Sequence, residues 1–494
     1  MSATEPTENT PGGAADGPGQ PRPAGSSRPA SGRVRRGETF EAEIETLAYG
    51  GRGIARRDGY VVFVSGGLPG DKVRAEVTKS KKGYAEANMT ELLERSPDRL
   101  EDVDVHQGEA CPGASWQALD YERQLAFKEE HVKDALSRIG HLGDVNLDPI
   151  VPALEQWRYR NKVEYSFGEQ DGELVLGFRP RGRWDQVLDI EDCHLSSEAT
   201  NHARNEFLAW AKSEGLPAYD PHDHRGVLRN LVVREGRRTG QVQTRLVTSS
   251  ANFPKPPVDL HTIIEGPSGG TSGPTGVLGE EVLRERIFDL NIQLSHDSFF
   301  QTNTEMAEKL YGLAAEYAGL TGSEKLFDLY CGVGTIGLSM AGQAGQVWGL
   351  EIVPDAIANA KKNAITNGIT NARFVAANAR TGMRPLIEEA GKPDVVTIDP
   401  PRAGLSAKIV RRLIECEARR IVYISCNPTT LAPNAAQLVE AGYKLNRVRP
   451  VDMFPQTPHI ECVAQFDLDL SRSIVVDRDI PAETGSETSA GGES

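Results

Sequence analysis

The spacing of hydrophobic and polar residues changes along this chain and divides it into three regions with different predicted structures. From Gly37 to about Leu93, short runs of alternating apolar and polar residues are separated by glycines. Such alternation is typical of strands that bury one face, and the glycines are typical of the turns between them. The pattern predicts a small OB-like β-barrel over residues 33–95.

The middle region, residues 96–290, combines one helical pattern with several strand-like runs. Apolar residues recur at helical spacing over Tyr121–Ile139, and β-rich runs follow between residues 159 and 248. Residues 265–276 contain five Gly and two Pro, which is typical of a flexible loop. We therefore predict a mixed α+β central domain.

From residue 291 to 470, apolar strand-like runs alternate with helical patterns, which indicates a doubly wound, Rossmann-like α/β sheet. The last two runs are separated only by PQTPH, residues 455–459. A parallel crossover needs a dozen or more residues, so these two runs should pair antiparallel. The prediction is a seven-stranded sheet that ends in an antiparallel hairpin.

The two ends of the chain lack the apolar residues that a packed core needs. Residues 1–32 contain six Pro and six Gly, residues 471–494 are acidic and rich in Ser and Gly, and we expect both to be disordered. No apolar run approaches the roughly 18 residues of a membrane span, and no secretory signal is recognisable. The six cysteines form no C-x-x-C pair. These features predict a cytoplasmic, monomeric enzyme without disulfides.

The net charge of −15 excludes a uniformly basic surface, yet the charge is unevenly distributed. Residues 33–83 carry a net charge of +4, and residues 157–184 form a second basic and aromatic concentration. Charge combined with aromatic side chains is typical of platforms for single-stranded RNA, although a solvated barrel surface is the alternative. In the first segment the relevant residues are Arg56, Arg57, Lys79, Lys81 and Lys82, with Tyr49, Tyr60 and Tyr84 between them.

A glycine-rich loop with the pattern G-x-G-x-x-G begins at Gly332, after a predicted strand and before a predicted helix. Gly332 and Gly334 allow the backbone to approach a ligand, and Glu351, at the end of the next strand, can accept hydrogen bonds from ribose hydroxyls. A nicotinamide dinucleotide and S-adenosylmethionine (SAM) both contain such a ribose, so the loop alone leaves both cofactors open. The acidic and aromatic residues just before the glycines, Asp328 and Tyr330, favour SAM.

Two further motifs end predicted parallel strands: DPPR begins at Asp399, and SCNP contains Cys426. Ligands of open parallel sheets lie beyond the carboxyl ends of the strands, so both residues should lie near the glycine loop. Glu461 opens the last strand, which runs antiparallel, so its beginning falls on the same edge. The sequence thus predicts that a thiol and a carboxylate from distant segments converge beside the cofactor.

Five motifs together resemble the SAM-dependent RNA 5-methyluridine methyltransferase family, of the type that acts on 23S ribosomal RNA. The combination of DPPR and SCNP with the late HIE is highly specific, whereas the glycine loop alone is not. The barrel resembles the TRAM domain that many members carry in front. The resemblance implies a class I methyltransferase fold for residues 291–470 and RNA-binding roles for residues 33–95 and 96–290. The motifs are FFQTN (299–303), DLYCGVGTIGL (328–338), DPPRAGL (399–405), SCNPTTLAPN (425–434) and PHIECV (458–463).

The resemblance also implies covalent catalysis at a uridine that has left its stack. The Cys426 thiolate would add to C6 of uracil, C5 would take the methyl group of SAM, and Glu461 would then remove the C5 proton so that elimination releases the cysteine. The residues that the resemblance assigns to the SAM site are Gln301, Tyr330, Gly332, Gly334, Glu351 and Asp399.

Two positions depart from the family pattern. Many members bind a [4Fe–4S] cluster through four cysteines, of which only Cys111 and Cys193 have counterparts here, with Ala114 where another is expected. Two thiolates do not complete a Cys₄ set, so we expect neither this cluster nor another metal. Thr335 stands where some members have Asn, which weakens any role assigned to that position.

The substrate stays open between ribosomal RNA, which the TRAM-like barrel favours, and transfer RNA. A 5-methylcytidine methyltransferase is disfavoured, because those enzymes place their nucleophilic cysteine in the motif that reads DPPR here. An NAD-dependent oxidoreductase would explain the glycine loop and Glu351 but neither the barrel nor the DPPR and SCNP motifs. We expect no membrane and no DNA partner.

Overall fold

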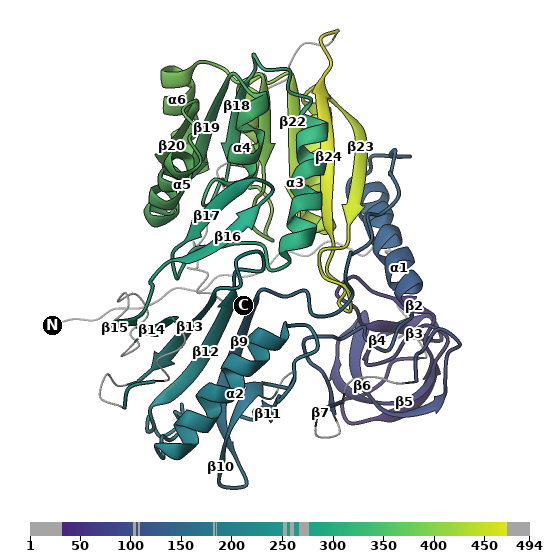
Figure 1. The fold of residues 1–494 in the computed structure, drawn as a ribbon. Helices are drawn as coiled ribbons and strands as arrows, with labels where there is room; N and C mark the ends of the chain where they lie inside the picture. Colours follow the sequence, from purple (N-terminus) through teal and green to yellow (C-terminus); the bar gives the residue numbers. More distant parts are fainter. Residues whose placement is uncertain are drawn as a thin grey trace, which may run out of the picture.

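The chain folds into an N-terminal β-barrel, a central α+β part and a C-terminal α/β part, in sequence order (Figure 1). The loop predicted over residues 265–276 and the two predicted tails lie almost entirely outside the described residues. In the part of the chain that is described, no helix is long and apolar enough to cross a membrane. The computed structural model describes residues 32–471 except for 102–104, 107–108, 181–182, 184, 250–253, 257–260 and 266–275.

Six strands form the N-terminal sheet, in the order β1-β5-β6-β4-β3-β2, and the sheet curls around its own core (Figure 1). Buried and half-exposed residues alternate along β4, as a strand with one buried face requires. Val62, Val73 and Val77 belong to this core. The strands are β1 (Thr39–Glu43), β2 (Thr46–Leu47), β3 (Gly53–Arg57), β4 (Tyr60–Ser65), β5 (Lys72–Ser80) and β6 (Tyr84–Glu94).

The structure corrects part of the RNA surface predicted for this barrel. Tyr60 is only 3% exposed, and its hydroxyl donates to two backbone oxygens at 2.6 Å, so it is a core residue. Arg56 and Arg57 lie in the strand β3, and both form ion pairs with glutamates. Tyr49 and Tyr84 remain exposed.

The second predicted basic group, residues 157–184, is also less exposed than its composition suggests. Arg160 and Lys162 are half-buried, and burial lowers the pKa of Lys162. Arg179 and Arg183 are the exposed arginines in the described part of this group. Fewer of these charges therefore face solvent than the sequence pattern predicted.

The helix α1 (Tyr121–Asp134) connects the barrel to the rest of the molecule. The side chain of Asp120 accepts hydrogen bonds from two backbone N–H groups of the first turn and so caps the helix. A π-helical turn, Ala135–Ile139, continues α1 to the residue at which the predicted helix ends. Two short strands, β7 (Val105–His106) and β8 (Glu109–Ala110), precede it.

The central part is a seven-stranded sheet in the order β11-β10-β9-β12-β13-β14-β15, with one helix packed against it. This helix, α2 (Glu198–Ser213), was not among the predicted elements, whereas the predicted β-rich runs contain β9, β10, β12 and β13. The strands are β9 (Lys162–Gln170), β10 (Glu173–Phe178), β11 (Leu188–Asp189), β12 (Leu228–Glu235), β13 (Val242–Thr248), β14 (His261–Glu265) and β15 (Gly276–Leu278).

The C-terminal sheet has seven strands in the order β20-β19-β18-β21-β22-β24-β23. The first five run parallel, whereas β24 is antiparallel to both of its neighbours. The strands are β18 (Lys325–Leu329), β19 (Gln346–Glu351), β20 (Ala372–Ala376), β21 (Val395–Ile398), β22 (Arg420–Ser425), β23 (Tyr443–Val451) and β24 (Glu461–Leu468).

Helices cover both faces of this sheet, as a doubly wound fold requires (Figure 1). One apolar core lies under α3 (Thr304–Ala318), α4 (Thr335–Met340) and α5 (Pro354–Thr366). The other lies under α6 (Ala379–Ala390), α7 (Ala407–Glu415) and α8 (Pro428–Glu440), together with the end of α1.

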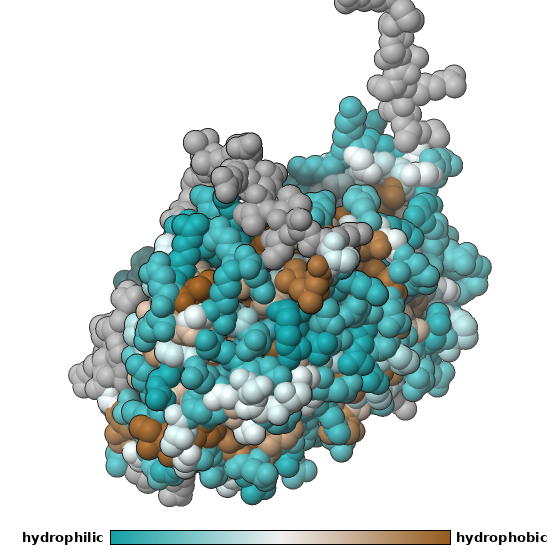
Figure 2. All heavy atoms as spheres, turned by 90° about the horizontal axis from the view of Figure 1, so that it is seen from above, coloured by the Kyte–Doolittle hydropathy of each residue, from teal (hydrophilic) through white to brown (hydrophobic). Residues whose placement is uncertain are grey.

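A hairpin of β16 (Leu283–Ile287) and β17 (Leu290–Leu294) spans the domain boundary predicted between residues 290 and 291. Its apolar residues belong to the core under α3, so the hairpin packs with the C-terminal part. Viewed from above, the molecular surface is mainly hydrophilic, with hydrophobic residues in small separate groups (Figure 2). Scattered apolar residues are normal on a surface in water.

Candidate active site

The carboxyl ends of the parallel strands bring the predicted reacting groups to one edge of the C-terminal sheet. Asp399 directly follows β21, and Cys426 directly follows β22. Glu461 is the first residue of β24. Because the register pairs Ser425 with Cys462, Cys426 and Glu461 occupy adjoining positions on two neighbouring strands.

Cys426 is a half-buried thiol among carboxyl groups. Burial raises its pKa to about 12, and the charges of Glu461 and Asp399 act in the same direction. The guanidinium of Arg402 opposes them and favours the thiolate. At neutral pH the sulfur is therefore protonated, and any reaction that uses it as a nucleophile must first remove that proton.

Glu461 is a buried carboxyl group with an unused oxygen. Its side chain is 3% exposed, and among the described residues its Oε2 atom has no hydrogen-bond partner. Burial raises the pKa of Glu461 well above its usual range, the charge of Asp399 raises it further, and Arg402 opposes the shift. Buried polar atoms are nearly always paired, so this oxygen indicates a site for a ligand rather than a purely structural position.

The glycine loop turns sharply after β18 and has the shape of a ligand cradle. Tyr330, Gly332 and Gly334 all have positive φ angles, 62°, 52° and 86°, which glycine adopts readily and tyrosine rarely. The Oε2 atom of Glu351 accepts from the Gly332 N–H at 3.3 Å, and its Oε1 atom accepts from the Val353 N–H at 3.0 Å. A Cβ atom at Gly332 would meet nothing within 4 Å, so the space above this glycine can admit a ligand.

Two aspartates lie beside this cradle: Asp328 is fully buried, and Asp399 is half-buried. Asp328 accepts hydrogen bonds from the Gly337 N–H at 2.9 Å and from Thr397 Oγ1 at 3.0 Å, and burial raises its pKa to about 7. Burial, together with the charge of Asp328, also raises the pKa of Asp399 to about 7. These carboxyl groups are hydrogen-bond acceptors that suit the hydroxyl and ammonium groups of a nucleoside ligand.

The loop before α3 carries Gln301, which is 5% exposed, and Phe299, which is 70% exposed. Asn303 caps α3, and its Nδ2 atom donates to the backbone oxygen of Met453 at 3.1 Å. This bond ties the loop to the segment that leads to Glu461. An exposed aromatic ring next to a buried polar residue is suited to contact a base, and sequence reasoning had not singled out Phe299.

The segment before Glu461, residues 452–458, is held by buried polar contacts from α1. Lys128 Nζ lies 2.6 Å from Asp452 Oδ1, and both side chains are 0% exposed. The Tyr121 hydroxyl donates to Asp452 Oδ2 at 2.9 Å, and Gln124 and Gln456 hydrogen-bond through their side chains at 2.8 Å. These residues position the chain that leads into β24.

Arg402 and His459, which sequence reasoning left unassigned, also lie near this edge, and so does Tyr49, which the sequence placed only on the predicted RNA surface of the barrel. Burial lowers the pKa of His459 to about 4, and the nearby charge of Arg402 lowers it further. Arg402 and His459 lie within the DPPR and PHIECV motifs, so the motifs themselves contained this signal. Tyr49 comes from the N-terminal barrel, and nothing in the C-terminal motifs indicates it.

The two cysteines related to the family's iron–sulfur ligands lie in one apolar cluster. Cys111 and Cys193 are buried there with Tyr159 and Leu195. Across the described ranges, no group of three or more His, Cys, Asp and Glu side chains is arranged to hold a metal ion. Two thiols do not supply the four thiolates of a [4Fe–4S] site, so the residues present do not fit this cluster.

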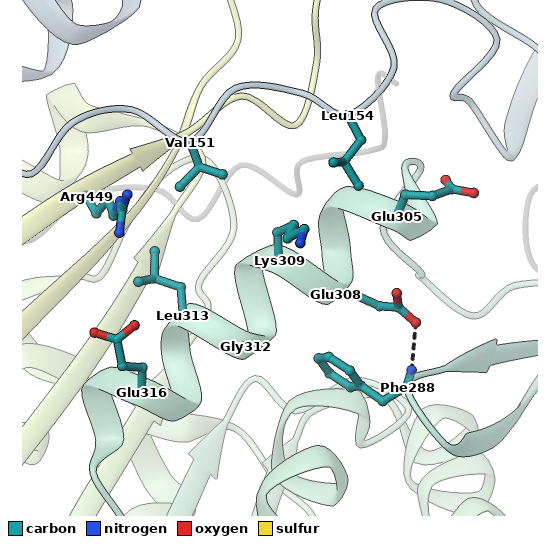
Figure 3. Close-up of a pocket in the computed structure, with 10 residues that line it drawn as sticks. All are labelled: Val151, Leu154, Phe288, Glu305, Glu308, Lys309, Gly312, Leu313, Glu316 and Arg449. Atoms are coloured by element: carbon teal, nitrogen blue, oxygen red, sulfur yellow. Dashed lines mark hydrogen bonds between the residues drawn. The ribbon is translucent and has the colours of Figure 1, made fainter.

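A groove of about 480 Å³ on the outer side of α3 is a separate feature (Figure 3). Val151, Leu154 and Leu313 give it an apolar wall, and Phe288 lies at its other end, with its N–H donating to Glu308 (Figure 3). None of the predicted site residues lines it. The groove therefore does not contribute to the chemistry at the sheet edge.

Comparison with known proteins identifies two matching family models. Residues 280–467 match the model described as tRNA (uracil-5-)-methyltransferase, and residues 33–90 match the TRAM domain. The second match coincides with the curled N-terminal sheet. The first contains the hairpin β16–β17 and the C-terminal sheet except for the last residue of β24.

Relatives that match over nearly their whole length are described more broadly, as RNA methyltransferases. An uncharacterized RNA methyltransferase of Halalkalibacterium halodurans is 37% identical over 451 residues, covering 88% of this chain and 98% of that protein. One from Nitratidesulfovibrio vulgaris is 36% identical over 453 residues, covering 86% and 95%. The fold is similar to the crystal structure of Pyrococcus abyssi tRNA (uracil-54, C5)-methyltransferase in complex with S-adenosyl-L-homocysteine. The two share 29% sequence identity with a TM-score of 0.71, and the match covers 86% of this chain and 99% of that one.

Proposed function

The chain belongs to the RNA uracil-5 methyltransferase family with an N-terminal TRAM domain, and we propose that it methylates C5 of a uridine in RNA with SAM as the methyl donor. One observation carries the proposal. The Cys426 thiol and the buried Glu461 carboxyl group occupy adjoining positions on neighbouring strands, at the sheet edge that also carries a glycine loop able to hold a nucleoside. The similar Pyrococcus abyssi enzyme binds S-adenosyl-L-homocysteine, the product that SAM leaves after methyl transfer.

The residues around the glycine loop fit SAM. We assign Glu351 to its ribose hydroxyls, because the carboxylate keeps acceptor capacity beyond its bonds to Gly332 and Val353. Tyr330, Gly334, Gln301 and Asp399 complete the proposed site. When bound, SAM supplies a methyl group activated for transfer to a nucleophilic carbon.

Cys426 makes that carbon nucleophilic. C5 of uracil is too weak a nucleophile to take a methyl group unaided, and addition of a thiolate to C6 gives C5 enolate character. Arg402 assists because its positive charge favours ionisation of the thiol. After methyl transfer C5 still carries its proton, and the sulfur remains bound to C6.

Glu461 resolves this intermediate. Its carboxylate removes the proton from C5, the C5–C6 double bond re-forms, and the electron pair of the C6–S bond returns to Cys426. The unused Oε2 atom is the acceptor that this step needs. A uracil base that is stacked between its neighbours in RNA is out of reach of Cys426. The target nucleotide must therefore leave its stack before the reaction.

Substitution of Cys426 by alanine tests the mechanism. We expect methyl transfer to total RNA to fall by roughly three orders of magnitude or more, whereas binding of S-adenosylhomocysteine stays nearly unchanged. Cys416→Ala is the matched control, because Cys416 is buried in the core under α6 to α8. Substantial residual activity of the Cys426 variant would exclude this residue as the nucleophile.

The RNA target is decided by a separate experiment. We propose ribosomal RNA on the strength of the TRAM barrel, whereas the names of the matching family and of the Pyrococcus abyssi enzyme favour transfer RNA as the second candidate. Mapping 5-methyluridine in both RNA fractions of a deletion strain separates them. Loss from transfer RNA alone would overturn the first choice.

An NAD-dependent oxidoreductase, the alternative that the glycine loop alone leaves open, is disfavoured by the family match. It predicts that NADH raises the melting temperature, whereas the present proposal predicts stabilisation by S-adenosylhomocysteine and not by NADH. The thiol and carboxyl pair at Cys426 and Glu461 has no role in hydride transfer, and this favours the methyltransferase.

A further inference from the structure

A loop of the N-terminal barrel reaches the catalytic edge of the C-terminal sheet. The loop connects β2 to β3 and spans residues 48–52. A Cβ atom on Gly51 would lie 2.9 Å from the side chain of Pro458, three residues before Glu461. The backbone oxygen of Gly51 also accepts a hydrogen bond from Trp116 Nε1 at 3.4 Å. The barrel is therefore in direct contact here with the segment that leads into β24.

His131 of α1 fixes the entry to this loop. Its Nε2 atom lies 3.0 Å from the backbone oxygen of Leu47, and its ring packs edge-on against the ring of Tyr49 with centroids 6.2 Å apart. Gly50 and Gly51 have φ angles of 90° and 85°, which permit the tight turn after Tyr49. The tyrosine ring is thus held at a defined position rather than left on a free loop.

The Tyr49 side chain is positioned to meet a substrate. It is 39% exposed, and its hydroxyl makes no hydrogen bond to any residue that the structure describes. Burial raises its pKa to about 12, and the charges of Cys426, Cys462 and Glu461 contribute to the shift. The hydroxyl is therefore protonated at neutral pH and lies in the electrostatic environment of the reacting thiol.

We propose that Tyr49 contacts the uridine that Cys426 attacks: its ring supplies a stacking surface, and its hydroxyl donates a hydrogen bond to a carbonyl oxygen of the base. This inference rests on the proposed function. Addition of sulfur to C6 moves electron density onto a carbonyl oxygen of uracil, and a donor aimed at that oxygen stabilises the addition. The barrel is then part of the active site and not only a surface that holds RNA at a distance.

A covalent trap separates this role from simple RNA binding. In transcripts of ribosomal and transfer RNA made with 5-fluorouridine, fluorine replaces the C5 proton that Glu461 must remove, so the adduct to Cys426 accumulates in the presence of SAM. We measure its rate of formation on denaturing gels at saturating RNA. Tyr49→Phe keeps the ring and should slow the adduct about 10-fold, and Tyr49→Ala should slow it about 100-fold.

Tyr84→Ala is the matched control, because Tyr84 is a similarly exposed tyrosine of the same barrel, at 36%. It should change only the RNA concentration needed for half-maximal rate. Tyr49→Phe and the wild type should have the same affinity for S-adenosylhomocysteine and the same melting temperature. If Tyr49 had a merely structural role, the substitution would change these two quantities.

The two proposals fail in different ways. If the wild type forms the adduct and both Tyr49 variants form it within twofold of the wild-type rate, the role of Tyr49 is overturned and the methyltransferase proposal stands. If the wild type forms no adduct with either transcript, the proposed mechanism fails and this inference fails with it.

Discussion

The buried pair of Lys128 and Asp452 offers a quantitative test of how the segment before the catalytic strand is held. The Nζ and Oδ1 atoms are 2.6 Å apart, and neither side chain is exposed. Asp452→Asn keeps the shape of the side chain. Its amide oxygen, in the place of Oδ1, can still accept from the Phe454 N–H, and its amide nitrogen, in the place of Oδ2, can donate to the Tyr121 hydroxyl oxygen. The substitution removes the negative charge that compensates the buried ammonium group.

The size of the stability loss in Asp452→Asn follows from the protonation state of Lys128. Burial already lowers its pKa, and Asp452 is the group that opposes this effect. Without that carboxylate, the folded variant holds Lys128 neutral, whereas the unfolded chain keeps it charged up to a pKa of about 10.4. Because burial lowers the pKa of Lys128 in the wild type as well, the loss of stability relative to the wild type, at about 1.4 kcal/mol per pH unit, is at most about 5 kcal/mol at pH 7 and at most about 2 kcal/mol at pH 9.

The sign of this pH dependence is specific. Because the folded variant binds fewer protons than the unfolded chain, its stability relative to the wild type rises with pH. Thermal melts of both proteins at the two pH values measure the difference. At about 2 °C per kcal/mol, the melting temperature should fall by at most roughly 10 °C at pH 7 and by at most roughly 4 °C at pH 9.

An exposed pair of nearly equal length is the control. Lys72 and Glu94 are 2.7 Å apart, with side chains 48% and 65% exposed. Glu94→Gln should lower the stability far less than Asp452→Asn does, because solvent already screens the pair. Equal losses for Asp452→Asn and Glu94→Gln, or a loss that does not shrink between pH 7 and pH 9, would refute the reasoning.

Three further substitutions probe the catalytic edge. Glu461→Gln should trap a covalent RNA adduct on denaturing gels, because C5 deprotonation is blocked, and the absence of any adduct with RNA and SAM both bound would argue against Glu461 as the base. Asp399→Asn removes a carboxyl group whose pKa is raised to about 7 by burial. As the pH rises from 4 to 7, ionisation of this group should cost the wild type up to about 4 kcal/mol of stability, whereas the variant should not show this loss in paired melts. Phe299→Ala should raise the KM for RNA about 10-fold in methyl-transfer assays with no change in S-adenosylhomocysteine affinity, and an unchanged KM would show that the exposed ring does not touch RNA.

The C-terminal fold and its reacting edge could be predicted because their rules are local. Each strand of this part is a short apolar run between helical patterns, and parallel strands place their carboxyl ends together. Cys426 and Glu461 were therefore brought to one edge by the direction of two strands alone. The antiparallel pairing of β24 with β22 completes that juxtaposition.

Contacts between distant segments could not be predicted. Tyr49 reaches the catalytic edge, and Lys128 meets Asp452 324 residues later in the chain, only because three parts of the molecule pack together. Neither contact has a periodicity that one sequence can show. Tyr60 was misassigned to the RNA surface for a related reason: composition reports how many aromatic residues a strand has, but the register of the strand decides which face each one occupies.

The electrostatics of the proposed mechanism explain why a thiol with so high a pKa can serve as its nucleophile. Ionised Glu461 disfavours the Cys426 thiolate, so the two charges are costly together at this buried edge. Addition needs the thiolate while Glu461 is still protonated, and burial keeps Glu461 protonated. Once sulfur is bound to C6 it is a neutral thioether and can no longer carry a negative charge beside the carboxyl group. Glu461 can then ionise and act as the base, so the mutual repulsion favours using the two groups one after the other.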